Sequence, residues 1–100
     1  MIEVRRSGTF DQWLKKLRDV RAVARINIRI ERLAAGNPGE VASVGDGVSE
    51  LKIDYGPGYR VYFTREGDEL VVLLCGGDKK TQAKDIKEAK RIAKEWKVKR

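Results

Sequence analysis

The apolar positions in the first third of the chain predict two helices. The first follows a break at Gly8, and its apolar residues recur every three or four positions, as on one side of a helix: Phe10, Trp13, Leu14 and Leu17. Either Thr9 or Asp11 caps its start. The second helix runs over about residues 20–35 and stops at the Gly-Asn-Pro-Gly segment 36–39. Its apolar stripe suits packing on a sheet: Val23, Ile26, Ile30 and Leu33.

The middle of the chain alternates with the period of two that strands show. Ile2 and Val4 alternate with charged residues and predict a short first strand, and residues 41–44 form another. Residues 50–55 and 59–64 alternate apolar with polar side chains, and Gly-Pro-Gly at 56–58 joins them as a turn. Residues 70–75 are apolar throughout, which predicts an interior strand covered on both faces.

The hairpin formed by residues 50–64 has a register that gathers its apolar side chains on one face. A three-residue loop pairs them in three rungs: Tyr55 with Tyr59, Ile53 with Val61, and Leu51 with Phe63. The opposite face then places Lys52 beside Tyr62, and Asp54 beside Arg60. We therefore expect a polar, partly basic face on the side of the sheet away from the first core.

The last segment predicts a third helix, which begins near a cap at Thr81 and is rich in lysine. Its apolar side carries Ile86, Ala89, Ile92, Ala93 and Trp96. The order is then strand, two helices, antiparallel strands, helix. This order predicts one α+β domain over residues 1–100, with two N-terminal helices packed on an antiparallel sheet and a C-terminal helix.

Charge adds the expectation of an anionic partner. The 100 residues hold 22 Lys and Arg against 15 Asp and Glu, a formal net charge of +7. Such an excess attracts polyanions, so nucleic acid, ribosomal RNA and an acidic protein all fit. The second helix carries a stripe of arginines that is either a solvated face or a surface for phosphate or an acidic partner: Arg21, Arg25, Arg29 and Arg32.

Several classes of chemistry are excluded by residues that the sequence lacks. It has no histidine, the usual general base and commonest metal ligand, and no cysteine or histidine set has metal-site spacing, so neither a metal nor a cofactor is expected. Cys75 is the single cysteine, so no internal disulfide forms and a reducing cytoplasm is the expected location. No segment has the pattern of a signal peptide or the length to span a bilayer.

A combination of short segments extends over nearly the whole chain, from about residue 5 to residue 95. The most specific are Gly-Pro-Gly-Tyr-Arg-Val-Tyr at 56–62 and Leu-Leu-Cys-Gly-Gly-Asp-Lys-Lys-Thr-Gln at 73–82. Phe-Asp-Gln-Trp-Leu at 10–14 and Gly-Val-Ser-Glu-Leu-Lys-Ile at 47–53 accompany them. With these segments the chain resembles the RelE/ParE superfamily of toxins, and within it the HigB-related group of addiction module killer proteins.

The resemblance implies a fold and an activity. Two N-terminal helices would cover one face of the sheet, and the other face would be a basic concavity, which in RelE-type relatives receives mRNA in the ribosomal A site. The implied protein is the toxin of a type II toxin–antitoxin module, a metal-independent and ribosome-dependent mRNA endonuclease that inhibits translation. A ParE-like, non-enzymatic inhibitor of DNA gyrase is the alternative, because one fold supports both functions.

The resemblance also implies roles for basic residues. Arg60 is expected to stabilise transition-state charge, since a guanidinium binds two phosphate oxygens and stays protonated. Lys52 is expected to be a base or a phosphate clamp, and Lys79 to support the phosphate or the leaving group. Substrate contacts are expected from a second set: Lys80, Gln82 and Tyr62.

Each of these residues also has an ordinary structural interpretation. Arg60 can form a cross-strand ion pair with Asp54, Lys52 can be an exposed strand residue, and Lys79 and Lys80 can be part of a turn. The chain departs from its relatives in one respect, because many of them have a catalytic tyrosine or histidine near the C-terminus. After residue 62 this sequence has neither.

The partners implied by the resemblance are the ribosome with its mRNA and a cognate antitoxin, a small helix-turn-helix protein. Operator DNA would be bound only through the toxin–antitoxin complex. No membrane partner is expected. The candidate docking surface for the antitoxin is the arginine stripe of the second helix, represented by Arg21, Arg25 and Arg29.

Overall fold

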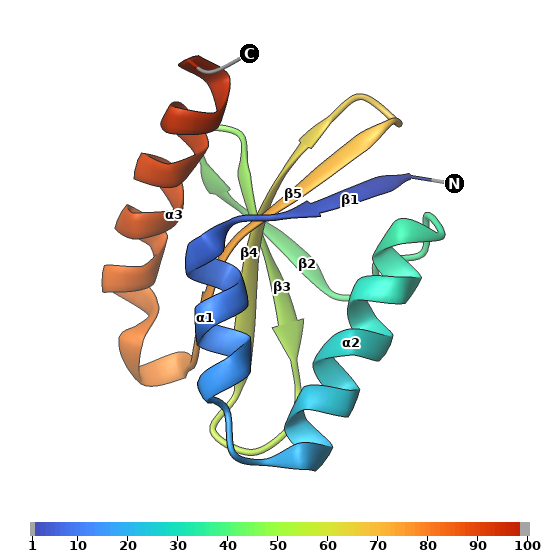
Figure 1. The fold of residues 1–100 in the computed structure, drawn as a ribbon, viewed down its shortest axis with the longest axis vertical. Coiled ribbons are helices and arrows are strands. Elements are labelled where there is room, and N and C mark those ends of the chain that lie inside the picture. Colours follow the sequence, from blue (N-terminus) through green and yellow to red (C-terminus); the bar gives the residue numbers. More distant parts are fainter. Residues whose placement is uncertain (1, 99–100) are drawn as a thin grey trace.

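The computed structural model describes residues 2–98, with the side chain of Val98 excepted. Its elements follow the order that the apolar pattern predicts, and the α+β class is confirmed (Figure 1). They are β1 (Glu3–Arg6), α1 (Gly8–Lys16), α2 (Val20–Ala34), β2 (Val41–Gly45), β3 (Val48–Ile53), β4 (Tyr59–Glu66), β5 (Leu70–Gly77), the short 3-10 helix η1 (Lys79–Thr81) and α3 (Gln82–Val98).

Side-chain caps mark the starts of α1 and of η1. Ser7 caps α1 by accepting a hydrogen bond from Phe10 N at 3.0 Å, so the expectation of Thr9 or Asp11 was wrong. The Ser7 hydroxyl also donates to the Leu74 carbonyl and thereby ties this helix start to the sheet. Before α3, the Asp78 carboxylate caps the short 3-10 helix η1, and α3 begins directly after Thr81, near the expected position.

The sheet has the strand order β1-β5-β4-β3-β2. The four strands from β2 to β5 pair antiparallel, as predicted, while β1 adds to β5 in the parallel direction. Strand β5 is an interior strand and is buried almost throughout, which confirms the interpretation of its apolar run, although it continues to Gly77.

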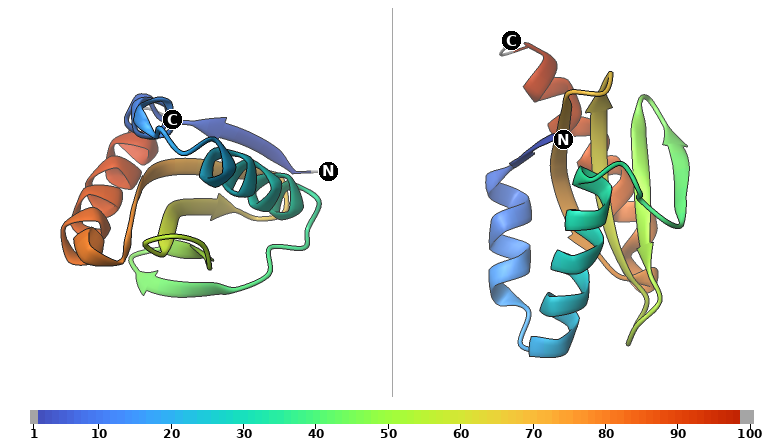
Figure 2. Two further views of the ribbon diagram at one scale, coloured as in Figure 1. Left: turned by 90° about the horizontal axis from the view of Figure 1, so that it is seen from below. Right: turned by 90° about the vertical axis from the view of Figure 1, so that its right-hand side faces the viewer.

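The two faces of the sheet support two separate cores. Helices α1 and α2 lie side by side on one face and bury residues such as Phe10, Ile26 and Leu51 (Figure 2). Helix α3 packs on the other face over Tyr62, Leu74 and their neighbours. The expected concavity therefore does not extend over the whole second face, because α3 occupies much of it.

The β3–β4 register differs from the prediction by two residues. Lys52 pairs with Arg60, and Ile53 with Tyr59, so the expected pairing of Lys52 with Tyr62 was wrong. The loop extends over residues 54–58 rather than three residues, and within it Gly56 and Gly58 adopt positive φ values of 58° and 80°, which glycine tolerates without strain. A shift of two positions leaves every side chain on its predicted face, since strand side chains alternate with a period of two.

Candidate functional site

A cavity of about 450 Å³ brings together the three residues that the sequence analysis assigned to catalysis. Lys52, Arg60 and Lys79 all line it, together with Glu40, Asp54, Gly56 and Gly58. The cavity lies at the β3–β4 turn, where η1 approaches the sheet. It is thus a polar hollow with three cationic and two acidic side chains at its wall.

The local fold explains why the cations converge. Lys52 and Arg60 are cross-strand partners on β3 and β4 and share a face. Lys79 reaches the cavity from a different element, since it is the first residue of η1, the 3-10 helix that Asp78 caps. A side chain on Gly58 would have its Cβ 3.5 Å from both Arg60 Nη1 and Lys79 Cβ. The Arg60 guanidinium and the base of the Lys79 side chain therefore both lie beside the bare backbone of Gly58.

Arg60 is held in place by a buried carboxylate. Its Nε lies 3.1 Å from Glu50 Oε1, close enough for an ion pair, although the N–H is not aligned for a hydrogen bond. Glu50 is only 1% exposed, and its other oxygen accepts a hydrogen bond of 2.7 Å from Gln82 Nε2 on α3. The Arg60 guanidinium is therefore fixed from behind while it borders the cavity.

Glu50 is a residue that the sequence analysis did not single out. It alternates with Lys52 and Asp54 along its strand, so its pattern matches that of an exposed position. Carboxylates are almost never fully buried without a partner, and here the partners come from β4 and α3. The sequence signal that could have indicated this ion pair is an acidic residue at a polar strand position together with an arginine on the next strand.

The residues expected to contact substrate lie in different surroundings in the structure. Tyr62 is fully buried beneath α3, so its expected contact with substrate was wrong. Burial raises the pKa of its hydroxyl, and the charges of Glu50 and Asp85 raise it further. Gln82 supports Glu50, while Lys80 is exposed on η1 and does not line the cavity.

The arginine stripe of α2 also divides. Arg29 donates hydrogen bonds to the carbonyls of Lys52 and Pro38, so its guanidinium ties α2 to the wall of the cavity. The guanidinium of Arg25 lies 4.6 Å from the centre of the Tyr55 ring, and Arg21 is exposed. Arg29 therefore has a structural role, whereas Arg21 and the outer part of Arg25 remain on the surface.

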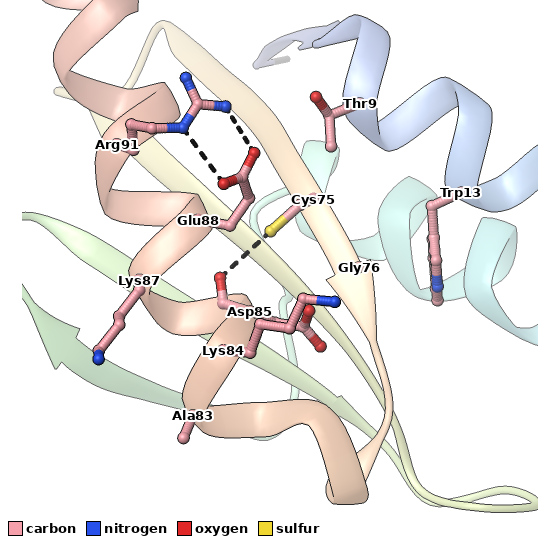
Figure 3. A pocket seen from close by; sticks show the side chains of 10 residues that line it. All are labelled: Thr9, Trp13, Cys75, Gly76, Ala83, Lys84, Asp85, Lys87, Glu88 and Arg91. Carbon is pink, nitrogen blue, oxygen red and sulfur yellow. Dashed lines mark hydrogen bonds and ion pairs between the residues drawn. The ribbon is translucent and has the colours of Figure 1, made fainter.

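The larger cavity, of about 780 Å³, lies between α1 and α3 beside the end of β5 (Figure 3). Two of its charged residues, Glu88 and Arg91, form an ion pair. The Cys75 thiol donates to the Asp85 carbonyl at 3.4 Å, and burial, with added effects of Asp85 and Glu88, raises its pKa to about 12. A thiol in that state is a poor nucleophile at neutral pH, so this cavity lacks the chemistry that the smaller one has.

Residues 12–97 match the family described as "Phage derived protein Gp49-like (DUF891)". A protein of Haemophilus influenzae, named only as uncharacterized, is 56% identical over 94 residues, which are 94% of this chain and 95% of that protein. No solved structure matches the chain. Along residues 2–98, no helix combines the length and apolar character that a bilayer crossing requires. The chain belongs to the phage-derived Gp49-like (DUF891) family, a RelE/ParE-like group.

Proposed function

We propose that this protein is the toxin of a type II toxin–antitoxin module and a metal-independent endonuclease that cleaves mRNA on the ribosome. One observation carries the proposal: Lys52, Arg60 and Lys79, which come from three different elements, line a single cavity. A net charge of +7 adds long-range attraction to RNA. Membership in a RelE/ParE-like group supports the same function.

The proposed reaction is attack by a ribose 2′-hydroxyl on the neighbouring phosphorus. The P–O5′ bond breaks, and the products are a 2′,3′-cyclic phosphate and a free 5′-hydroxyl. The transition state gathers negative charge on the phosphate oxygens, so fixed cations stabilise it more than they stabilise the ground state. This requirement suits a guanidinium that Glu50 has already oriented.

The three cations take different parts in this scheme. Arg60 binds the non-bridging phosphate oxygens, since a guanidinium suits phosphate and the side chain borders the cavity. Lys52, its cross-strand partner, clamps the phosphate from the adjacent strand. Lys79, which lines the same cavity from η1, protonates the departing 5′-oxygen.

The test is a reconstituted translation reaction in which the 5′ and 3′ ends of a defined message are mapped after the protein is added. We expect cuts within the A-site codon that depend on the ribosome, and Arg60→Ala should slow them by about 10²- to 10³-fold, the usual effect of losing one charge-stabilising donor. Lys97→Ala, on exposed surface far along α3, is the matched loss of a positive charge.

Two outcomes contradict the proposal. Intact messages with normal translation would remove it. Intact messages together with inhibited DNA supercoiling by gyrase would replace it with the non-enzymatic function that the RelE/ParE fold also supports.

We also propose a cognate antitoxin, a small helix-turn-helix protein, and operator binding only by the joint complex. Of the predicted docking residues, Arg21 and Arg25 present charge on the surface of α2, while Arg29 is engaged by backbone carbonyls. Charge reversal at Arg21 and Arg25 should weaken the complex in a titration that follows relief of toxicity. Unchanged affinity would place the antitoxin elsewhere.

A further inference from the structure

Asp54 is a carboxylate that lines the same cavity as Lys52, Arg60 and Lys79. It directly follows Ile53, the last residue of β3, and Ile53 pairs with Tyr59. Beyond this pair, toward the turn, Asp54 follows β3 and Gly58 precedes β4. Gly58 lies beside the Arg60 guanidinium and the base of the Lys79 side chain. Asp54 therefore shares one cavity wall with the three cationic side chains.

The Asp54 carboxylate is not occupied by a structural ion pair. The sequence pattern predicted a pair between Asp54 and Arg60, but Arg60 pairs with Glu50 instead. Among the side chains described, those of residues 2–97, Asp54 has neither an ion pair nor a hydrogen bond. Glu50 thus balances the arginine from inside the protein, and an exposed carboxylate is left over in the cavity.

The proposed reaction needs a group that accepts the 2′-hydroxyl proton. The chain has no histidine, and lysine and arginine side chains normally carry their proton at neutral pH. Tyr62 is buried under α3 and is also protonated. The groups at the cavity that can accept a proton are therefore its two carboxylates, those of Glu40 and Asp54.

The position of the two carboxylates favours Asp54. Glu40 precedes β2, the outermost strand, and its backbone carbonyl accepts from Lys52 N at 3.1 Å. It thus flanks Lys52 on the side away from Arg60. Asp54 lies on the side of Lys52 toward the β3–β4 turn, where Arg60 and Lys79 both lie beside Gly58. A 2′-hydroxyl next to a phosphate held by these cations would face Asp54.

We propose that Asp54 is the general base of this site, an inference that rests on the proposed endonuclease function. An Asp54 oxygen takes the proton of the 2′-hydroxyl as O2′ forms its bond to phosphorus. The P–O5′ bond breaks, and the O5′ takes a proton from the Lys79 ammonium. Asp54 is then protonated and Lys79 neutral, and proton exchange through water restores both. No oxidant, metal or further reactant is required.

The experiment measures single-turnover cleavage of an A-site codon on programmed ribosomes by the wild-type protein and by Asp54→Asn. Affinity is measured separately on a message whose target ribose carries 2′-deoxy, which binds but cannot be cut. We expect Asp54→Asn to cleave about 10²- to 10⁴-fold more slowly, the usual contribution of a general base, with an affinity within about threefold of wild type. Asp68→Asn is the matched control, since its side chain is 97% exposed on the β4–β5 turn.

Chemical rescue distinguishes a lost base from a merely altered site. Asp54→Ala leaves space in an open cavity, so added formate should raise its cleavage rate at least tenfold. Formate should not change the cleavage rate of the wild type or of Arg60→Ala. Asp54→Glu should retain more activity than Asp54→Asn. Thermal melting should be unchanged in the three Asp54 variants, since the Asp54 side chain makes no ion pair within the described part of the chain.

The contrary outcomes are distinct. Cleavage by Asp54→Asn within threefold of wild type overturns the general base and leaves the nuclease proposal intact. A loss of affinity as large as the loss of rate assigns Asp54 to binding and also overturns the general base. So does a rate loss that formate rescues in Glu40→Ala and not in Asp54→Ala. A wild-type protein that cuts no message overturns the proposed function, and the general base with it.

Discussion

Replacement of Glu50 by Gln tests whether the carboxylate behind the cavity supports both the fold and the site. The Glu50 side chain is 2% exposed and that of Arg60 13%, with the two charged groups 3.1 Å apart. Breaking a fully buried pair by removing one partner costs about 3–5 kcal/mol. Because Arg60 borders the solvent of the cavity and a glutamine still accepts the hydrogen bond from Gln82, we expect a smaller loss, of about 2 kcal/mol in the free energy of unfolding.

Two assays are used: equilibrium denaturation, which gives the free energy of unfolding, and thermal melting, which gives Tm. A loss of about 2 kcal/mol in a domain of this size lowers Tm by about 8–16 °C. Glu88→Gln is the matched control, because its partner Arg91 is 54% exposed and surface pairs contribute little, so its loss should be clearly smaller. The cycle of Glu50→Gln, Arg60→Ala and the double variant should show a coupling energy of about 1–2 kcal/mol.

Two results would refute this reasoning. A Glu50→Gln protein as stable as Glu88→Gln would mean that burial of the pair contributes nothing. A coupling energy near zero would mean that Glu50 and Arg60 act independently, and that the guanidinium is oriented by its other contacts, which include the Gly58 carbonyl at 3.3 Å.

Three further predictions concern the packing around β5. In Gly76→Ala the new Cβ would lie 2.3 Å from the Trp13 ring, so overpacking should lower the free energy of unfolding by about 1–3 kcal/mol in denaturant melts. Adding Trp13→Leu should restore part of that stability. A Gly76→Ala protein as stable as the wild type would contradict this. Ser7→Ala loses the cap on Phe10 N and the bond to the Leu74 carbonyl, so we expect a loss of about 1–2 kcal/mol, and an unchanged Tm would contradict it. Burial raises the pKa of Cys75 from 9.0 to about 12, so the thiol ionises first in the unfolded chain, and stability should fall as pH rises from about 9 to 12, by up to about 1.4 kcal/mol per pH unit. Cys75→Ala should show a shallower fall, and equal slopes for the two proteins would refute the assignment.

Much of the architecture follows from local regularities of the sequence. Spacings of three and four residues mark the helices, and the period of two marks the strands, because each reflects which side chains share a face of one element. The same alternation placed Lys52 and Arg60 on one face, away from α1 and α2, as the structure has them. That assignment survived a wrong register because a shift of two residues preserves the face.

Relations between elements required the folded chain. Alternation says that Glu50, Lys52, Asp54 and Tyr62 lie on polar or second faces, but it does not say what covers those faces. Helix α3 covers Tyr62 and Glu50 and stops short of Lys52 and Asp54. Along one strand, Glu50 is therefore buried and supports Arg60, whereas Lys52 lines an open cavity. The exchange of the expected Asp54–Arg60 pair for Glu50–Arg60 has the same origin. Periodicity describes one element at a time, whereas burial and ion pairing depend on distances between residues far apart in the chain, and these distances exist only once the elements have packed.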